Sequence, residues 1–188
     1  MRVIGAAFNF KGLEHESGVP ILFYKTHDPE YVWEGKENSI ILPKEVKKVW
    51  AEVEVAFSIL KAGDKAVIEG YAVANDITAD YGADCHFLLG KSRPSFCKIA
   101  RPWSFVKPNF NGRMIMRVNG TLLQDGRLRE MIIQPQALVT LIDRRIGLET
   151  GDIVLSGTPF HTASPLRKGD TVEVEVEGLG NIVSKVKI

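Results

Sequence analysis

Residues 113–124 read RMIMRVNGTLLQ, and this stretch sets the character of the fold. Two runs of strand-forming residues, 113–118 and 121–124, flank the pair Asn119-Gly120. Asn-Gly is the preferred central pair of a type I′ turn, whose backbone twist matches that of two antiparallel strands. The sequence therefore predicts a β-hairpin at this place.

Strand-like runs also dominate the rest of the chain. Residues 171–177 and 181–188 form a closing pair of strands around Gly178 and Gly180. Several other runs end at glycine, proline or asparagine, as strands commonly do. The further strands expected on this pattern are 1–10, 19–25, 39–42, 50–59, 67–75 and 152–157.

Helical patterning is confined to two segments. Pro135 suits the first position of a helix over 135–146, apolar residues recur on one face of that segment, and Gly147 can end it. A second, short helix is expected at 43–49. Many short strands with few helices favour a β-rich α+β fold, a rolled sheet or sandwich, over a doubly wound parallel sheet.

Composition narrows the class of protein. The 188 residues suit a single domain spanning 1–188, and 45% hydrophobic with 25% charged residues is an ordinary globular mixture. Lys and Arg number 24 against 23 Asp and Glu, so we expect neither a nucleic acid nor a membrane surface as partner. The absence of a long apolar run and the two cysteines, Cys85 and Cys97, favour a cytoplasmic protein with reduced thiols.

The first candidate site lies in residues 50–57, WAEVEVAF. Side chains alternate between the faces of a strand, so Glu52 and Glu54 point the same way. Two carboxylates this close repel each other unless a cation or solvent intervenes. The segment 172–177 shows the same alternation and is expected to be an exposed strand face, so a solvated face and a metal site both remain open for Glu52 and Glu54.

Two further side chains are candidates on local grounds. Asp76 ends an apolar run where Asn-Asp would suit a turn, but together with Glu52 and Glu54 it would complete an all-oxygen site. Such a site suits Mg²⁺ or Mn²⁺ rather than zinc. Lys91 lies among apolar and small residues with Arg93 nearby, which fits either a surface charge or an anion-binding turn.

An ordered series of segments, covering nearly the whole chain, resembles the fumarylacetoacetate hydrolase family. Each segment alone is weak, but their common order makes the resemblance specific. The segments are GAAFNF at 5–10, PILFYK at 20–25, AEVEVAF at 51–57, GYAVANDIT at 70–78, KSRPSFC at 91–97, VNGTLLQ at 118–124, GDIVLSGTP at 151–159 and VEVEGLG at 174–180.

The resemblance implies a mixed β-roll, a homodimer and a small-molecule 2-oxo acid or dicarboxylate substrate. It implies that Mg²⁺ or Mn²⁺ is held by Glu52, Glu54 and Asp76, and that Lys91 polarises a substrate oxygen as a catalytic residue. The side chains expected to contact substrate are Gln124, Thr158 and Arg93.

One departure from the family pattern bears on the reaction. In hydrolase members a histidine and a glutamate follow the Asn-Tyr pair, whereas here Leu13 takes the histidine position and Glu16 matches the glutamate. His15 is a possible shifted substitute. Because the missing base is what activates water for hydrolysis, the sequence favours an isomerase or decarboxylase acting on 2-oxo or 2-hydroxy-dienoic acids of a catabolic pathway. The likeness is to the family's 2-hydroxyhepta-2,4-diene-1,7-dioate isomerase group.

Two alternatives remain open at this stage. One is a C–C hydrolase of acylpyruvates or fumarylacetoacetate in which His15 and Glu16 supply the base. The other is a non-catalytic relative that binds 2-oxo acids. A second departure from the family pattern is that Asp80 stands where the family has an arginine shortly after Asn-Asp.

Overall fold

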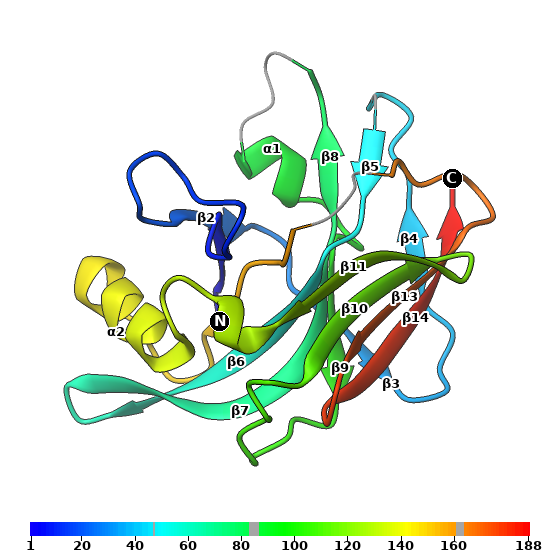
Figure 1. Cartoon of the computed structure of the whole chain (residues 1–188). Coiled ribbons are helices and arrows are strands. Elements are labelled where there is room, and N and C mark those ends of the chain that lie inside the picture. Colours follow the sequence, from blue (N-terminus) through cyan, green and yellow to red (C-terminus); the bar gives the residue numbers. More distant parts are fainter. Residues whose placement is uncertain (47, 83–86, 161–163) are drawn as a thin grey trace.

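The computed structural model describes residues 1–46, 48–82, 87–160 and 164–188. Within this part of the chain, two curved sheets form the body of the molecule (Figure 1). The larger sheet has the strand order β2-β1-β12-β6-β7-β9-β3. Its strands are β1 Val3–Ala7, β2 Ile21–Lys25, β3 Glu30–Trp33, β6 Val53–Ala62, β7 Lys65–Asp76, β9 Cys97–Arg101 and β12 Ile153–Leu155.

The second sheet has the order β11-β10-β13-β14-β4, and a short ribbon, β5-β8, lies apart from both. Two α-helices and one 3-10 turn are added in the described residues. These elements are β4 Ser39–Ile41, β5 Lys48–Trp50, β8 Thr78–Asp80, α1 Phe87–Lys91, β10 Arg113–Val118, β11 Thr121–Arg127, η1 Leu128–Glu130, α2 Pro135–Ile146, β13 Thr171–Val176 and β14 Gly180–Lys187.

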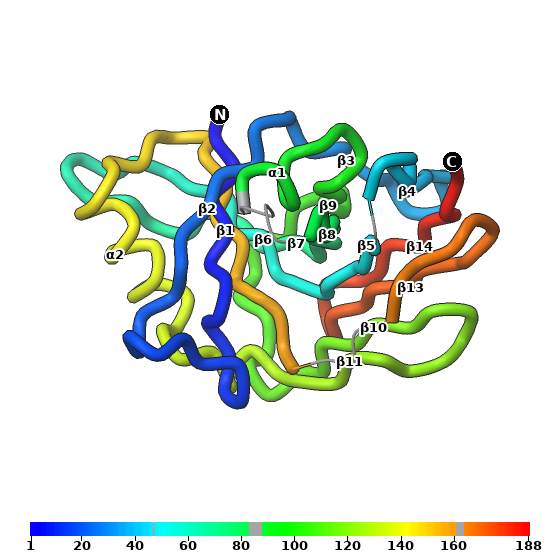
Figure 2. The backbone as a smooth tube through the Cα atoms, turned by 90° about the horizontal axis from the view of Figure 1, so that it is seen from above, coloured from blue at the N-terminus to red at the C-terminus, as the bar shows by residue number. Residues whose placement is uncertain are grey.

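One hydrophobic core joins the two sheets. Val55 and Phe57 of β6 pack in the same cluster as Val172 and Val174 of β13, and all four are fully buried. Seen from above, α2, β1 and β2 lie on one side of the molecule, and β10, β13 and β14 lie on the other (Figure 2). The β-rich α+β fold expected from the sequence is confirmed.

The strongest local signals are also confirmed. β10 and β11 pair as a hairpin, and Asn119 and Gly120 at its turn have φ of 51° and 80°, as a type I′ turn requires. The helix α2 begins at Pro135, and the N–H of Gly147 caps it by donating to Asp143 O at 2.9 Å.

Two expectations about elements are wrong. The short helix expected at 43–49 is absent from the described residues there, because Lys48–Trp50 forms a strand that pairs with β8. The strand expected at 50–59 is divided, since β5 ends at Trp50 and β6 begins only at Val53. The break at Ala51 and Glu52 carries the chain from the ribbon into the large sheet.

The glutamates of β13 alternate with buried valines as expected, but Glu173 and Glu175 are less exposed than the sequence predicts. Glu173 and Glu175 are half-buried, and Arg117 of the neighbouring strand lies 3.5 Å from Glu175. Cys97 is a free, buried thiol, whereas Cys85 lies outside the described residues. None of the helices in the described part is both long and apolar enough to cross a lipid bilayer.

Candidate functional site

Pairing of β6 with β7 brings the three candidate carboxylates together. Glu54 lies near the start of β6, Glu52 immediately precedes that strand, and Asp76 ends β7. The backbone N–H of Asp76 donates to the carbonyl of Glu52 at 3.0 Å, which places the two residues side by side. One carboxylate oxygen from each of the three residues lies within 4.8 Å of the others.

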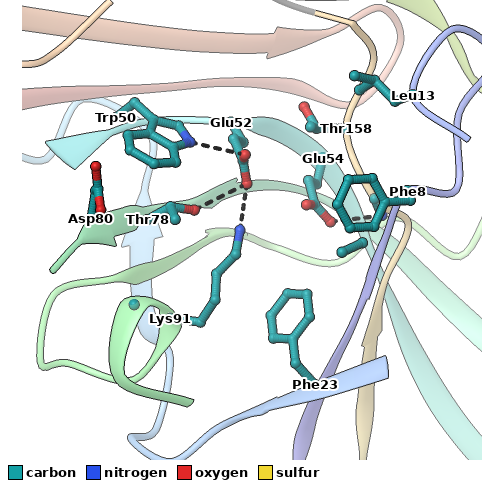
Figure 3. Close-up of a pocket in the computed structure, with 13 residues that line it drawn as sticks. Phe8, Leu13, Phe23, Trp50, Glu52, Glu54, Thr78, Asp80, Lys91 and Thr158 are labelled. Atoms are coloured by element: carbon teal, nitrogen blue, oxygen red, sulfur yellow. Dashed lines mark hydrogen bonds and ion pairs between the residues drawn. The ribbon is translucent and has the colours of Figure 1, made fainter. Parts of the chain in front are cut away.

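Lys91, at the end of α1, directs its ammonium group at the carboxylate of Glu52 (Figure 3) and also contacts Asp76. Its Nζ lies 2.5 Å from Glu52 Oε2 and 2.6 Å from Asp76 Oδ2. Burial alone would lower the pKa of Lys91, but the charges of Asp76, Glu52 and Glu54 outweigh it and raise the pKa. The side chain therefore carries a fixed positive charge beside the cluster.

A second lysine, Lys25 at the end of β2, holds Asp76 from the other side. Its side chain is 2% exposed and forms an ion pair with Asp76 Oδ1. The same ammonium donates to the carbonyls of Phe96 at 2.7 Å and Lys91 at 2.9 Å. Lys25 therefore ties Asp76 to the helix that carries Lys91. Sequence reasoning missed this role, because one lysine at a strand end carries no local sign of burial.

Glu54 is a buried acid of the cluster, and its proton affinity is perturbed. Its Oε2 accepts a hydrogen bond from the N–H of Gly157 at 2.8 Å. Burial raises the pKa of Glu54 well above the usual value, and the charges of Asp76 and Glu52 add to this despite the opposing charge of Lys91. Gly157 has φ of 82°, and a Cβ there would lie 2.5 Å from the carbonyl oxygen of Ala6.

The balance of charges in the cluster favours the binding of a cation. The three carboxylates of Glu52, Glu54 and Asp76 are paired with two ammonium groups, those of Lys25 and Lys91. Burial is the main cause of the raised pKa of Glu54, and the nearby negative charges of Asp76 and Glu52 raise it further. Carboxylate oxygens are hard donors, so the residues present fit a divalent cation that prefers oxygen ligands.

The cluster opens into a pocket of about 370 Å³, a size that suits a small-molecule ligand (Figure 3). Its walls come from elements far apart in the sequence, including β2, β5, β8 and α1. The described lining residues are Ala7, Phe8, Leu13, Phe23, Trp50, Glu52, Glu54, Thr78, Asp80, Gly90, Lys91, Gly157 and Thr158.

Of the residues expected to contact substrate, Thr158 lines the pocket and Gln124 does not. Gln124 is 1% exposed; its Oε1 accepts from the N–H of Val53 at 2.9 Å and its Nε2 donates to Thr158 Oγ1 at 2.8 Å. The Thr158 hydroxyl in turn donates to the carbonyl of Val53 at 2.9 Å. Gln124 thus fixes the turn that carries Thr158 against β6.

The remaining candidates lie outside the described pocket wall. Arg93 donates to Glu45 at 2.6 Å and to the hydroxyl of Tyr81 at 2.7 Å. His15 lies on the loop that follows β1, where its Nδ1 is 2.8 Å from Ser17 Oγ, and Glu16 on the same loop is exposed. Leu13, rather than either of them, lines the pocket.

Residues 5–187 match the family model described as the C-terminal domain of fumarylacetoacetate (FAA) hydrolase. The chain belongs to this family. Among curated relatives, it is 35% identical over 173 residues to the mitochondrial oxaloacetate tautomerase FAHD2B of Bos taurus, covering 81% of this chain and 55% of that protein. It is 27% identical over 183 residues to the mitochondrial oxaloacetate tautomerase FAHD1 of Mus musculus, covering 89% and 81%. The chain spans about half the length of the first of these relatives.

Solved structures of the family share the fold. The 5-carboxymethyl-2-hydroxymuconate delta-isomerase of Mycobacterium smegmatis superposes with a TM-score of 0.83 at 26% identity, over 99% of this chain and 76% of that one. The fumarylpyruvate hydrolase of Pseudomonas aeruginosa, solved with Mn²⁺ and pyruvate, gives 0.86 at 22% identity, over 100% and 90%. The second likeness shows the fold alone. Isomerases, tautomerases and hydrolases are thus all found among relatives of this fold.

Proposed function

We propose that the chain is a divalent-metal-dependent enzyme that interconverts the keto and enol forms of 2-oxo acids. The observation that carries the proposal is the cluster of Glu52, Glu54 and Asp76, of which Glu52 and Glu54 line a pocket, with the Lys91 ammonium against Glu52 and Asp76. A 2-oxo acid offers a carboxylate and an adjacent oxygen, which is the donor pair that a cation at such a cluster takes up.

The metal would be Mg²⁺ or Mn²⁺, held by Glu52, Glu54 and Asp76. When bound, it supplies Lewis-acid stabilisation of the negative charge that develops on the substrate oxygen. Lys91 adds a fixed positive charge beside the same oxygen, with no rearrangement needed during reaction. Phe8, Leu13 and Phe23 add apolar surface to the pocket wall.

Isomerisation is favoured over hydrolysis by the composition of the pocket wall. Keto–enol isomerisation needs a group that accepts a proton from the carbon next to the carbonyl and an acid that gives one to the oxygen, but it consumes no water and needs none activated. Hydrolysis needs a base that activates water, and the described wall carries Leu13 rather than His15 or Glu16. Decarboxylation passes through the same kind of enolate, so the same cluster supports it as a second reaction.

The direct test is the variant Glu52→Gln, which removes one anionic oxygen donor and keeps the shape of the side chain. Metal-dependent turnover of enolisable 2-oxo acids, followed by the ultraviolet absorbance of the enol, should fall by at least about a hundredfold. Without added metal, the melting temperature of the variant should stay close to that of the wild type.

The matched control is Glu175→Gln, which changes a glutamate of the same alternating pattern on β13, far from the pocket. It should leave turnover unchanged. Wild-type turnover in Glu52→Gln would reject the assigned metal site.

A further inference from the structure

The two sides of the pocket differ in chemical character. Phe8 and Leu13 lie on one side of the carboxylate cluster, and Asp80 with Trp50 lies on the opposite side (Figure 3). Phe23 extends the apolar surface below Lys91. A ligand whose head group sits at the cluster therefore meets apolar surface in one direction and a carboxylate in the other.

Asp80 is held at this position by the backbone. It ends β8, and its Oδ1 accepts a hydrogen bond from the N–H of Gly82 at 2.7 Å, which fixes the orientation of the carboxylate. Lys48 is opposite Asp80 in the β5–β8 ribbon, but its side chain is exposed and does not line the pocket. Asp80 thus belongs to the pocket wall, whereas Lys48, its cross-strand neighbour on the same face of the ribbon, is exposed and is not among the described lining residues.

The described lining offers no spare cation to a second carboxylate. Lys91 is the one cationic side chain among the described lining residues, and its ammonium is already paired with Glu52 and Asp76. Among the described lining residues, a negatively charged tail would therefore meet apolar surface on one side and Asp80 on the other, and no unpaired cation. Desolvation of a charge without a partner is unfavourable, and a like charge nearby adds repulsion.

For an uncharged, apolar tail, entry into the pocket is favourable. The aromatic and aliphatic surfaces of Phe8, Leu13, Phe23 and Trp50 gain from contact with an apolar group that leaves water. A pocket of about 370 Å³ also holds more than a bare 2-oxo acid head group.

We propose that this pocket selects 2-oxo acids with an uncharged, apolar tail, and that Asp80 is the residue that excludes a second carboxylate. The inference rests on the proposed function, because it assumes that the 2-oxo acid head group binds at Glu52, Glu54 and Asp76. It adds the substrate class and a specificity-determining residue.

The test is calorimetric titration of Mn²⁺-loaded protein with two ligands of equal chain length. 2-Oxopentanoate ends in a methyl group and 2-oxoglutarate ends in a carboxylate, and oxalate serves as a probe of the head-group site alone. The wild type should bind 2-oxopentanoate at least about tenfold more tightly than 2-oxoglutarate, the order expected for one like charge near the tail. Asp80→Asn should reduce this ratio by at least about threefold, and oxalate affinity should stay the same.

The control variant is Asp64→Asn, which makes the same change in the turn between β6 and β7, away from the pocket. Equal affinity for the two ligands, or an unchanged ratio in Asp80→Asn, would overturn the inference and leave the proposed function standing. Selective loss of 2-oxoglutarate binding in Lys48→Met would assign tail recognition to Lys48 and overturn it as well. If oxalate also fails to bind the Mn²⁺-loaded protein, the proposed function fails and the inference fails with it.

Discussion

Single residues show how a buried cluster of charges is kept in one arrangement. Lys25 forms an ion pair with one carboxylate oxygen of Asp76 and Lys91 with the other. The backbone N–H of Gly157 donates a hydrogen bond to Glu54. The carboxylate cluster was predictable from sequence, because alternation puts Glu52 and Glu54 on one face and the resemblance adds Asp76. The contribution of Lys25 was not, because it depends on three carbonyls and a carboxylate that come together only in the folded chain.

Removal of the Lys25 ammonium should be costly. Lys25→Met leaves part of the buried charge of Asp76 without its partner, so the free energy of unfolding should fall by about 3–5 kcal/mol. Lys187→Met, which breaks an exposed ion pair with Glu37 at 3.4 Å, should cost at most about 1 kcal/mol. Urea unfolding of both variants measures the difference. Equal losses of stability in the two variants would show that the buried ion pair of Lys25 with Asp76 contributes no more than an exposed one.

The raised pKa of Glu54 has a defined effect on stability. The folded, metal-free protein holds this proton more tightly than the unfolded chain, so stability should fall as pH rises from the ordinary range of a glutamate towards the raised pKa. The neutral variant Glu54→Gln should lack this loss. Melting temperatures of the two metal-free proteins across this pH range measure it, and parallel curves would contradict the assignment.

At the scale of secondary-structure elements, turn and capping residues correctly predicted the elements that depend on neighbouring residues in the sequence. Asn119-Gly120 determines the β10–β11 hairpin, and Pro135 and Gly147 bound α2. The expectation of a helix at 43–49 failed because β5 is stabilised by its pairing with β8, about thirty residues later. β9 was also missed, because the fully buried Lys98, its second residue, interrupts the apolar pattern.

The turn after β12 provides a test of element geometry. Gly157→Ala adds a Cβ at a left-handed φ and directs it against the backbone of Ala6, next to the N–H that holds Glu54. Gly151→Ala meets the same strain in open space and should cost about 1–2 kcal/mol. Thermal unfolding should show that Gly157→Ala is less stable than Gly151→Ala by about 1–3 kcal/mol. Equal losses would mean that the close approach at Gly157 is not constraining.

At the scale of the whole molecule, the site depends on contacts between distant parts of the chain. β1 pairs with β12, and the N–H of Arg2 donates to Asp152 at 2.8 Å, so the beginning of the chain is joined to a segment near its end. The pocket then gathers β2, the β5–β8 ribbon, β6 and α1 around one cluster. Such long-range assembly cannot be deduced from local pattern, and only the ordered resemblance to a family anticipated it.

A cation that completes the cluster should stabilise the whole fold, because it binds the folded chain and not the unfolded one. At a Mn²⁺ concentration about one hundred times the dissociation constant, the gain should be about 2.7 kcal/mol. Melting curves with and without Mn²⁺ measure it. The gain should be absent in Glu52→Gln, and a gain of equal size in that variant would place the metal elsewhere.

The most direct test of the assigned site is calorimetric titration of oxalate into metal-free protein, with and without added Mg²⁺. Oxalate imitates the chelating enolate of a 2-oxo acid, so its binding reports the cation site and the substrate class together. The cluster of Glu52, Glu54 and Asp76 predicts binding only when Mg²⁺ is present. Equal binding in the absence of Mg²⁺, or no binding under either condition, would contradict a metal-dependent 2-oxo acid site.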